Sequence, residues 1–192
     1  MTATTSLNDV LQLAIAASSK GDSDGALALF KRAMHEAPEA PEPHFLAASE
    51  YASRGDLDFA EQEFGLAVLL DPGMAVARYQ LGLLQYSSGR VAAAQVSWLP
   101  LLELADSSPL PHWVQGFMAL AQDRYEAARQ YFEAGLAQHQ DNPPMASDIR
   151  KVLHAMDALA PADAADGASA SAAFDPTPEN ELSHVLLSNY RH

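Results

Sequence analysis

Apolar residues recur along most of the chain at the spacing of amphipathic helices, and short polar turns separate the helical stretches. The first stretch follows the i, i+3, i+4, i+7 pattern that places side chains on one helix face, at Val10, Leu13, Ala14 and Ala17. Gly21 predicts the end of this helix, because glycine readily adopts the left-handed conformation that caps a helix C-terminus. A second amphipathic helix follows and ends at Pro38. The pattern therefore predicts a helical hairpin at the start of the chain.

The hairpin pattern recurs every 34 residues, without a shift in register, over residues 7–40, 41–74, 75–108 and 109–142. The first helix has a column of small residues, followed by a turn column: Ala14, Ala48, Gly82 and Gly116, then Gly21, Gly55, Gly89 and Asp123. The second helix has an alanine column, an aromatic column and a column that is mostly small: Ala26, Ala60, Ala94 and Ala128; Phe30, Phe64, Trp98 and Phe132; Ala33, Ala67, Leu101 and Gly135. Small residues let two helices approach closely, and the aromatic residue fills the remaining gap. Since one hairpin cannot bury its own apolar faces, the copies are expected to stack into a solenoid.

The 34-residue period and the order of small residue, glycine, alanine, aromatic, alanine and proline resemble the tetratricopeptide repeat (TPR). Pro38 and Pro72 match the closing proline of that family, whereas Asp106 and Gln140 stand there in the later copies. The resemblance covers 7–142 and implies an all-α, right-handed α-solenoid of four helix-turn-helix repeats. Pro100 lies inside the second helix of the third copy, so this helix is expected to kink or stop near it.

Three further segments follow the repeats. The pattern over about 145–159 predicts a capping helix, so the solenoid domain is expected to span 1–160. Residues 161–180 are mostly Ala, Asp, Ser and Pro and predict a flexible linker. Residues 181–192 regain apolar character and predict an amphipathic helix or docking motif, with Leu182, Val185, Leu186, Leu187 and Tyr190.

The sequence offers little support for catalysis. Residues 21–25 match G-x-S-x-G, the nucleophile elbow of hydrolases, but they fall in the expected turn of the first hairpin, whereas that motif needs a preceding strand. The seven histidines include no i, i+4 pair, and the chain has no cysteine, so no metal site is predicted. His44 and His112 share a repeat position, which favours packing over ligation. We expect a protein that is not an enzyme and needs no cofactor.

Charge and hydropathy narrow the classes of partner. The net charge of −14 leaves no basic footprint for nucleic acid. No apolar run reaches the length of a membrane-spanning helix, and the N-terminal sequence does not resemble a signal peptide, so a cytoplasmic protein without membrane insertion is expected. Residues 1–74 carry 4 basic and 12 acidic groups, a net charge of −8. This charge either keeps the surface soluble or attracts a basic partner.

The TPR resemblance implies a concave groove lined by the first helix of each copy. The residues that would line it are mostly apolar or aromatic: Phe45, Val76, Tyr79, Leu83, Tyr86, Leu110, Trp113, Phe117 and Leu120. The carboxylate clamp of chaperone-type members is absent, because Leu11, Ile15, Phe45 and Ser49 stand in its positions. The alternative is that some of these side chains pack between neighbouring helices.

These features favour an adaptor whose groove binds an apolar or amphipathic peptide or helix of a protein partner. A secretion chaperone of the type III class II kind is the first alternative, and an accessory subunit that supports a partner enzyme is the second. The terminal motif is expected to dock in its own groove, in that of a second copy, or on another protein.

Overall fold

The computed structural model describes residues 6–105, 107–138 and 142–159, and within them all regular structure is helical. The chain divides into two compact units between Leu84 and Gln85. The first unit holds α1 (Leu7–Ser18), α2 (Ser23–Glu36), α3 (Pro41–Arg54), α4 (Leu57–Leu70) and the start of α5 (Ala75–Ser87). The second holds the end of α5, α6 (Val91–Trp98), the 3₁₀ helix η1 (Leu99–Glu103), α7 (Leu110–Leu120), α8 (Tyr125–Leu136) and α9 (Pro143–Leu159). The expected all-α fold is confirmed.

Each turn of the repeat pattern contains one residue in the left-handed conformation. The turn column has φ values of 77° at Gly21, 80° at Gly55, 75° at Gly89 and 56° at Asp123. In the first turn, Asp22 caps α2 by accepting a hydrogen bond from the backbone N–H of Gly25 at 3.0 Å. The G-x-S-x-G match is thus a helix-to-helix turn, as its register predicts.

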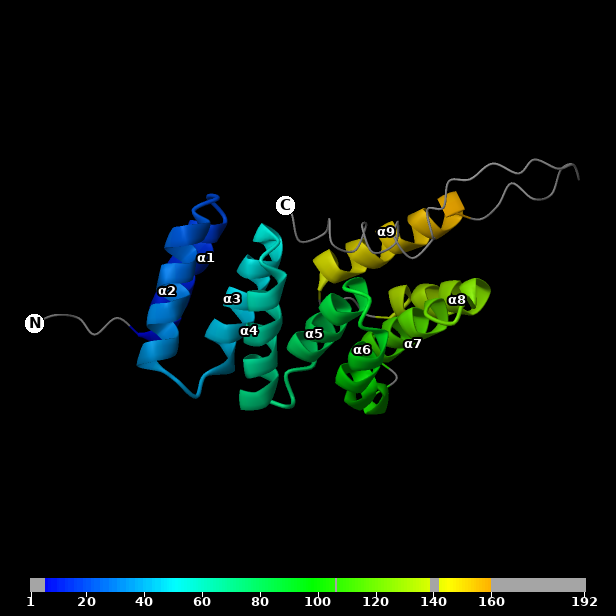
Figure 1. The fold of residues 1–192 in the computed structure, drawn as a ribbon, viewed down its shortest axis with the longest axis horizontal. Helices are drawn as coiled ribbons and strands as arrows, with labels where there is room; N and C mark the ends of the chain where they lie inside the picture. Colours follow the sequence, from blue (N-terminus) through cyan, green and yellow to red (C-terminus); the bar gives the residue numbers. More distant parts are fainter. Residues whose placement is uncertain (1–5, 106, 139–141, 160–192) are drawn as a thin grey trace, which may run out of the picture. The chain divides into compact units, whose positions relative to one another are not determined.

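The first unit is built from two helical hairpins, α1–α2 and α3–α4, with α2 packed against α3 (Figure 1). The repeating small and aromatic residues form its core: Ala14, Ala26, Phe30 and Ala33 in the first hairpin, and Ala48, Ala60, Phe64 and Ala67 in the second. All eight are buried. The aromatic ring lies where two helices with small side chains leave space, which is the role that its column predicts.

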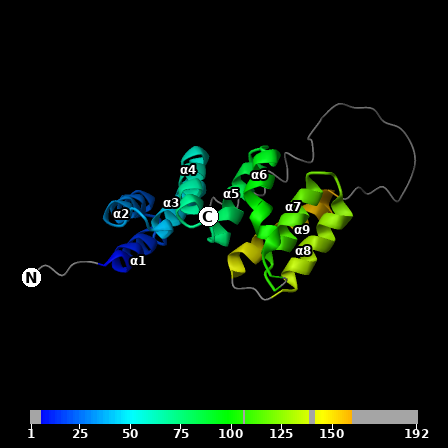
Figure 2. The ribbon, with the colours of Figure 1, turned by 90° about the horizontal axis from the view of Figure 1, so that it is seen from below.

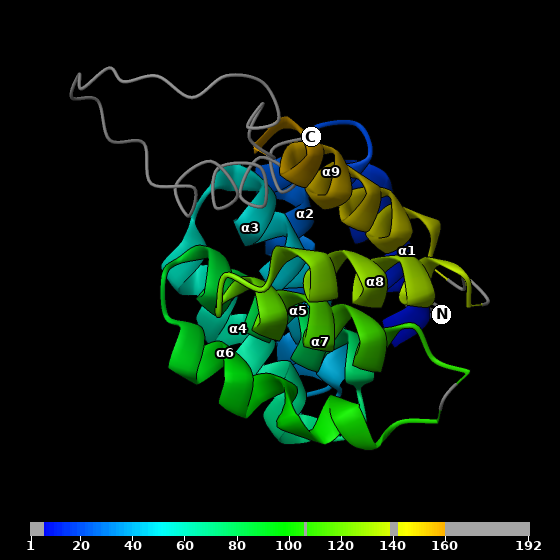
Figure 3. The same cartoon turned by 90° about the vertical axis from the view of Figure 1, so that its right-hand side faces the viewer.

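The second unit has a core of aromatic rings. In it, α7 packs against α8, and α8 against α9, as Figures 2 and 3 show. The ring of Phe117 lies 5.6 Å from that of Trp98 and 5.0 Å from that of Phe132, centroid to centroid. Tyr86 joins the same group, with its ring 5.4 Å from Phe117. Two residues of the repeat columns, Trp98 and Phe132, thus meet a third ring from α7.

Pro100 ends the α-helical part of the third copy. The last residue of α6 is Trp98, and the chain continues as η1, with Pro100 at its second position. A proline has no N–H to donate and its ring clashes with the preceding turn, so the tighter 3₁₀ geometry replaces the α-helix. The expected interruption near Pro100 is confirmed, and Leu101 in η1 remains buried.

The C-terminal helix α9 has one apolar face and one polar face. Ile149, Val152 and Met156 are buried, whereas Arg150 and Lys151 are exposed. This amphipathic pattern is that of a helix that covers the end of a helical stack.

Candidate binding site

The structure buries much of the groove that the sequence predicts. Five of its residues are buried: Tyr79, Leu83, Trp113, Phe117 and Leu120. Four are half-buried: Phe45, Val76, Tyr86 and Leu110. The expectation of one open apolar face is thereby corrected for the five buried side chains. That any of the nine contacts a partner stays a prediction.

The burial of two of these residues has a local cause in the packing of α7 against α8. A Cβ atom built on Gly135 would lie 2.4 Å from Nε1 of Trp113, so the indole rests directly on the glycine. A Cβ on Gly116 would lie 2.4 Å from Cε1 of Phe132, which shows the same close approach in the opposite direction. The ring of Phe117 lies 5.0 Å from that of Phe132, so Trp113 and Phe117 both belong to the hydrophobic core of the second unit.

The predicted docking motif, with Leu182, Val185, Leu186, Leu187 and Tyr190, lies outside the described residues. The same holds for the predicted linker 161–180.

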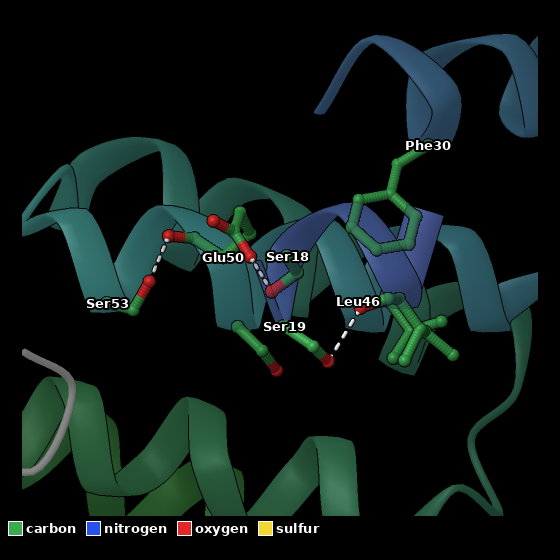
Figure 4. Close-up of a pocket in the computed structure, with 8 residues that line it drawn as sticks. Ser18, Ser19, Phe30, Leu46, Glu50 and Ser53 are labelled. Atoms are coloured by element: carbon green, nitrogen blue, oxygen red, sulfur yellow. Dashed lines mark hydrogen bonds between the residues drawn. The ribbon is translucent and has the colours of Figure 1, made fainter. Parts of the chain in front are cut away.

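The first unit contains a pocket that the sequence did not predict. Its volume is about 220 Å³, and it lies between α1, α2 and α3. The lining consists of three apolar side chains, four serines and one glutamate: Ile15, Leu46 and Phe30; Ser18, Ser19, Ser49 and Ser53; and Glu50. Figure 4 shows the carboxylate of Glu50 and the hydroxyl of Ser18 pointing toward each other across the two neighbouring helices.

The serine hydroxyls of the pocket all donate hydrogen bonds to the protein. Ser18 Oγ donates to Oε2 of Glu50 at 2.6 Å. The other three donate to backbone carbonyl oxygens: Ser19 to Ile15 at 2.9 Å, Ser49 to Phe45 at 3.0 Å and Ser53 to Glu50 at 2.8 Å. Since neither a carbonyl nor a carboxylate can donate, the direction of each bond is fixed. The oxygen of each serine therefore remains available only as an acceptor.

Glu50 is the charged group of the pocket. It is 8% exposed and lies in α3, whose exposed residues, Glu42 and Arg54, stand near its two ends. The nearby cation is Arg54, whose guanidinium contacts Asp24 at 2.6 Å and Asp56 at 3.1 Å. The hydrogen bond with Asp24 is the main reason why the pKa of Arg54 is raised, and the charges of Asp24, Asp56 and Glu50 contribute to it. Arg54 is thus bound to two other carboxylates and does not line the pocket.

Two positions in the sequence carry a signal for this pocket. Ser18 and Ser49 are polar at positions where the later copies have large apolar or aromatic residues, such as Tyr86 and Phe117. The burial of Glu50 is not predictable from the sequence pattern, because it depends on a contact between α1 and α3. In that contact Glu50 meets Ser18, which is 32 residues away in the sequence.

No metal-binding cluster of three or more His, Cys, Asp or Glu side chains is present among the described residues. His44 contacts Glu63 through Nδ1 at 2.6 Å, and both side chains are half-buried, so this histidine links α3 to α4. In the described part of the chain, no helix combines the length and apolar character needed to cross a membrane.

Comparison with known proteins gives the fold. No protein-family model matches the chain, and no curated protein matches it. Among solved structures, "Crystal structure of MamA" matches with a TM-score of 0.58 and 18% identity, covering 69% of this chain and 77% of that one. A second, "MamA MSR-1 C2", matches with a TM-score of 0.53 and 21% identity, covering 68% and 75%. MamA is a TPR-like helical solenoid, and at these identities the likeness shows that this chain has an all-α helical repeat fold.

Proposed function

We propose that this protein is a non-enzymatic adaptor that binds an apolar or amphipathic segment of a partner protein. The observation that carries the proposal is the pocket of about 220 Å³ formed by α1, α2 and α3. Its lining combines apolar side chains with hydroxyl groups and one carboxylate, so it offers both apolar contact and hydrogen bonds to a segment of a partner. The MamA-like repeat fold supports a role in protein interaction.

The contact surface that we propose lies on the first unit. Ile15 is 39% exposed at the edge of the pocket, and Leu46 lies half-buried beside it. Leu11 and Phe45, one helical turn before Ile15 and Ser49, are also half-buried. An apolar side chain of the partner would pack against these residues, and polar groups beside it would meet the serines. Of the groove predicted from sequence, Phe45 belongs to this surface.

Three other residues of the predicted groove, Val76, Tyr86 and Leu110, keep partial exposure and stay candidates for contact with the partner. The five buried residues are unsuitable for a binding test, because polar substitutions there would disrupt the core.

The test compares two substitutions on one helix. Ile15→Asn places a polar amide at the edge of the pocket, whereas Leu13→Asn makes the same change at a leucine that is 55% exposed and does not line the pocket. Successive residues of a helix lie ~100° apart, so the two positions face different directions. The full chain would be immobilised, its partners captured from extracts of its own cells and quantified by mass spectrometry, and each candidate then measured with purified components.

We expect Ile15→Asn to remove a partner that both the unchanged protein and Leu13→Asn retain. Partners that reside in a cellular assembly would support the adaptor, and secreted clients would support a chaperone instead. Equal capture by all three proteins would contradict the proposed surface.

A further inference from the structure

We propose that the pocket of the first unit binds a basic side chain, arginine or lysine, that the partner protein presents. This inference rests on the proposed adaptor function and specifies the chemistry of the segment that is bound.

The polar lining of the pocket favours a ligand that donates hydrogen bonds. The hydroxyls of Ser18, Ser19, Ser49 and Ser53 direct their protons to Glu50 or to backbone carbonyls, which leaves oxygen lone pairs for a ligand. A guanidinium has five N–H donors and an ammonium has three, and neither has an acceptor. A phosphate or carboxylate would meet oxygen acceptors and a like charge, so anions are disfavoured.

Glu50 supplies the charge that a cation requires. Its side chain is 8% exposed, and Ser18 holds one of its carboxylate oxygens, Oε2, at 2.6 Å. The other oxygen, Oε1, takes no part in this hydrogen bond. A mostly buried carboxylate gains most from a partner of opposite charge with direct hydrogen bonds. Arg54 does not fill this role, because Asp24 and Asp56 hold its guanidinium.

The size and the apolar walls of the pocket fit one long side chain. Its volume of about 220 Å³ exceeds that of a cavity that holds benzene, ~150 Å³, and lies below the ~300 Å³ at which drug-sized sites begin. Ile15, Leu46 and Phe30 provide apolar surface for the methylene groups of an arginine or lysine stem. Residues 1–74, with a net charge of −8, would also attract a basic segment from a distance.

The experiment uses the full chain and two small probes. N-acetyl-arginine amide carries the guanidinium, and N-acetyl-citrulline amide has the same shape without the charge. Binding is followed by ¹H–¹⁵N NMR through the backbone amide signals of Ser18, Ser19 and Glu50. We expect saturable shifts at these residues with the arginine probe, at a Kd of about 1 mM, and none that saturate with citrulline.

Two variants of α3 distinguish the effect of the charge in the pocket from the effect of the net charge of the protein. Glu50→Gln keeps the shape of the side chain and removes its charge, and we expect it to weaken binding roughly tenfold or more. Glu42→Gln removes a charge from the same helix about 12 Å away along its axis and should leave the Kd within about twofold.

A third variant keeps the test decisive if Glu50→Gln lowers the helical content. Ser49→Leu fills the pocket with apolar volume and retains Glu50, and the hydroxyl that it removes bonds only within α3. We expect Ser49→Leu to abolish the saturable shifts.

The results distinguish this inference from the adaptor proposal. Equal binding of both probes, or arginine binding that survives both Glu50→Gln and Ser49→Leu, would overturn the basic-side-chain site, as would the absence of saturable shifts. The comparison of Ile15→Asn with Leu13→Asn leaves the pocket charge unchanged and would still test the adaptor by itself. Loss of a captured partner in Glu50→Gln but not in Glu42→Gln would support both proposals together.

Discussion

The contact between Trp113 and Gly135 predicts a large effect from the addition of one methyl group. In Gly135→Ala, the new Cβ would lie 2.4 Å from Nε1 and 2.5 Å from Cδ1 of Trp113. Carbon atoms pack optimally at ~3.5–4.0 Å, so the indole or the helix must move by about 1 Å. Trp113 is 1% exposed, so its ring is surrounded by other atoms of the protein.

The expected magnitude follows from two opposing terms. Overpacking of a core costs about 1–3 kcal/mol, and the rigid indole places this site near the upper end. Alanine has a higher helix propensity than glycine, and this difference stabilises α8 by about 1 kcal/mol. We therefore expect Gly135→Ala to lower the free energy of unfolding by about 2 kcal/mol.

A matched control should change the free energy of unfolding in the opposite direction. Gly65 lies inside α4, and a Cβ built on it has no atom within 4 Å. Gly65→Ala should gain helix propensity without a clash and stabilise the protein by up to about 1 kcal/mol.

A second substitution tests whether Trp113 is the cause. The second copy has Phe45 in the column of Trp113 and Ala67 in that of Gly135, so a smaller ring and an alanine already occur together. Trp113→Phe alone should cost about 1–2 kcal/mol through the space it leaves. Combined with Gly135→Ala, it should cost less than the sum of the two by at least about 1 kcal/mol.

Urea denaturation provides the measurement. Far-UV circular dichroism reports on all helices, whereas both tryptophans, Trp98 and Trp113, lie in the second unit. Tryptophan fluorescence of Gly135→Ala and of the unchanged chain therefore follows the unfolding of that unit. Additive effects in the double variant, or a Gly135→Ala that is as stable as the parent, would refute the packing argument.

Further predictions concern turns and caps. Gly55→Ala should lower the free energy of unfolding, measured by urea denaturation, by about 1–2 kcal/mol, because an L-residue is strained in the left-handed conformation. Asp123→Gly should raise it by about 0.5–1 kcal/mol. Equal effects of the two substitutions would contradict this reasoning. Ser6→Ala should remove the N-cap of α1 and cost about 1 kcal/mol, measured as lost helicity and a lower melting temperature. Ser6 donates to Asp9 through Oγ at 2.8 Å and through its backbone N–H at 3.1 Å, and these bonds, that of the side chain first, lower the pKa of Asp9 below 3.8. Because the pKa of Asp9 is lower in the folded state than in the unfolded state, this stabilisation is present above pH 3.8 and is lost as the pH falls through the folded pKa. Asp9→Asn should therefore flatten the dependence of the free energy of unfolding on pH in that range. An unchanged pH profile would contradict the role given to Asp9.

The sequence predicts the elements of this fold well, because the information for each is local. A glycine that ends a helix, an alanine that permits close packing and a proline that interrupts a helix act within a few residues. The repetition of Gly21, Gly55 and Gly89 at one spacing adds a check that a single hairpin would lack.

The binding surface is harder to predict, because it depends on contacts between helices. Trp113 belongs to a column that the TPR resemblance assigns to the groove. Its indole nevertheless packs in the core, because Gly135 has no side chain and leaves room for it. Glu50 has the composition of a surface residue, and its burial follows from Ser18 on a different hairpin. Neither outcome is visible without knowing which side chains meet across helices.

The left-handed turns have a consequence for the chirality of the chain. At Gly21, Gly55 and Gly89, φ lies between 75° and 80°, and a Cβ in the position of an L-residue would meet no atom within 4 Å. The obstacle to a side chain there is thus the handedness of the residue and not its volume. D-alanine prefers this region for the same reason that L-alanine avoids it. In a chemically synthesised chain, D-alanine at these turns would restrict the unfolded state while matching the folded one, so three achiral positions could be converted into stabilising ones.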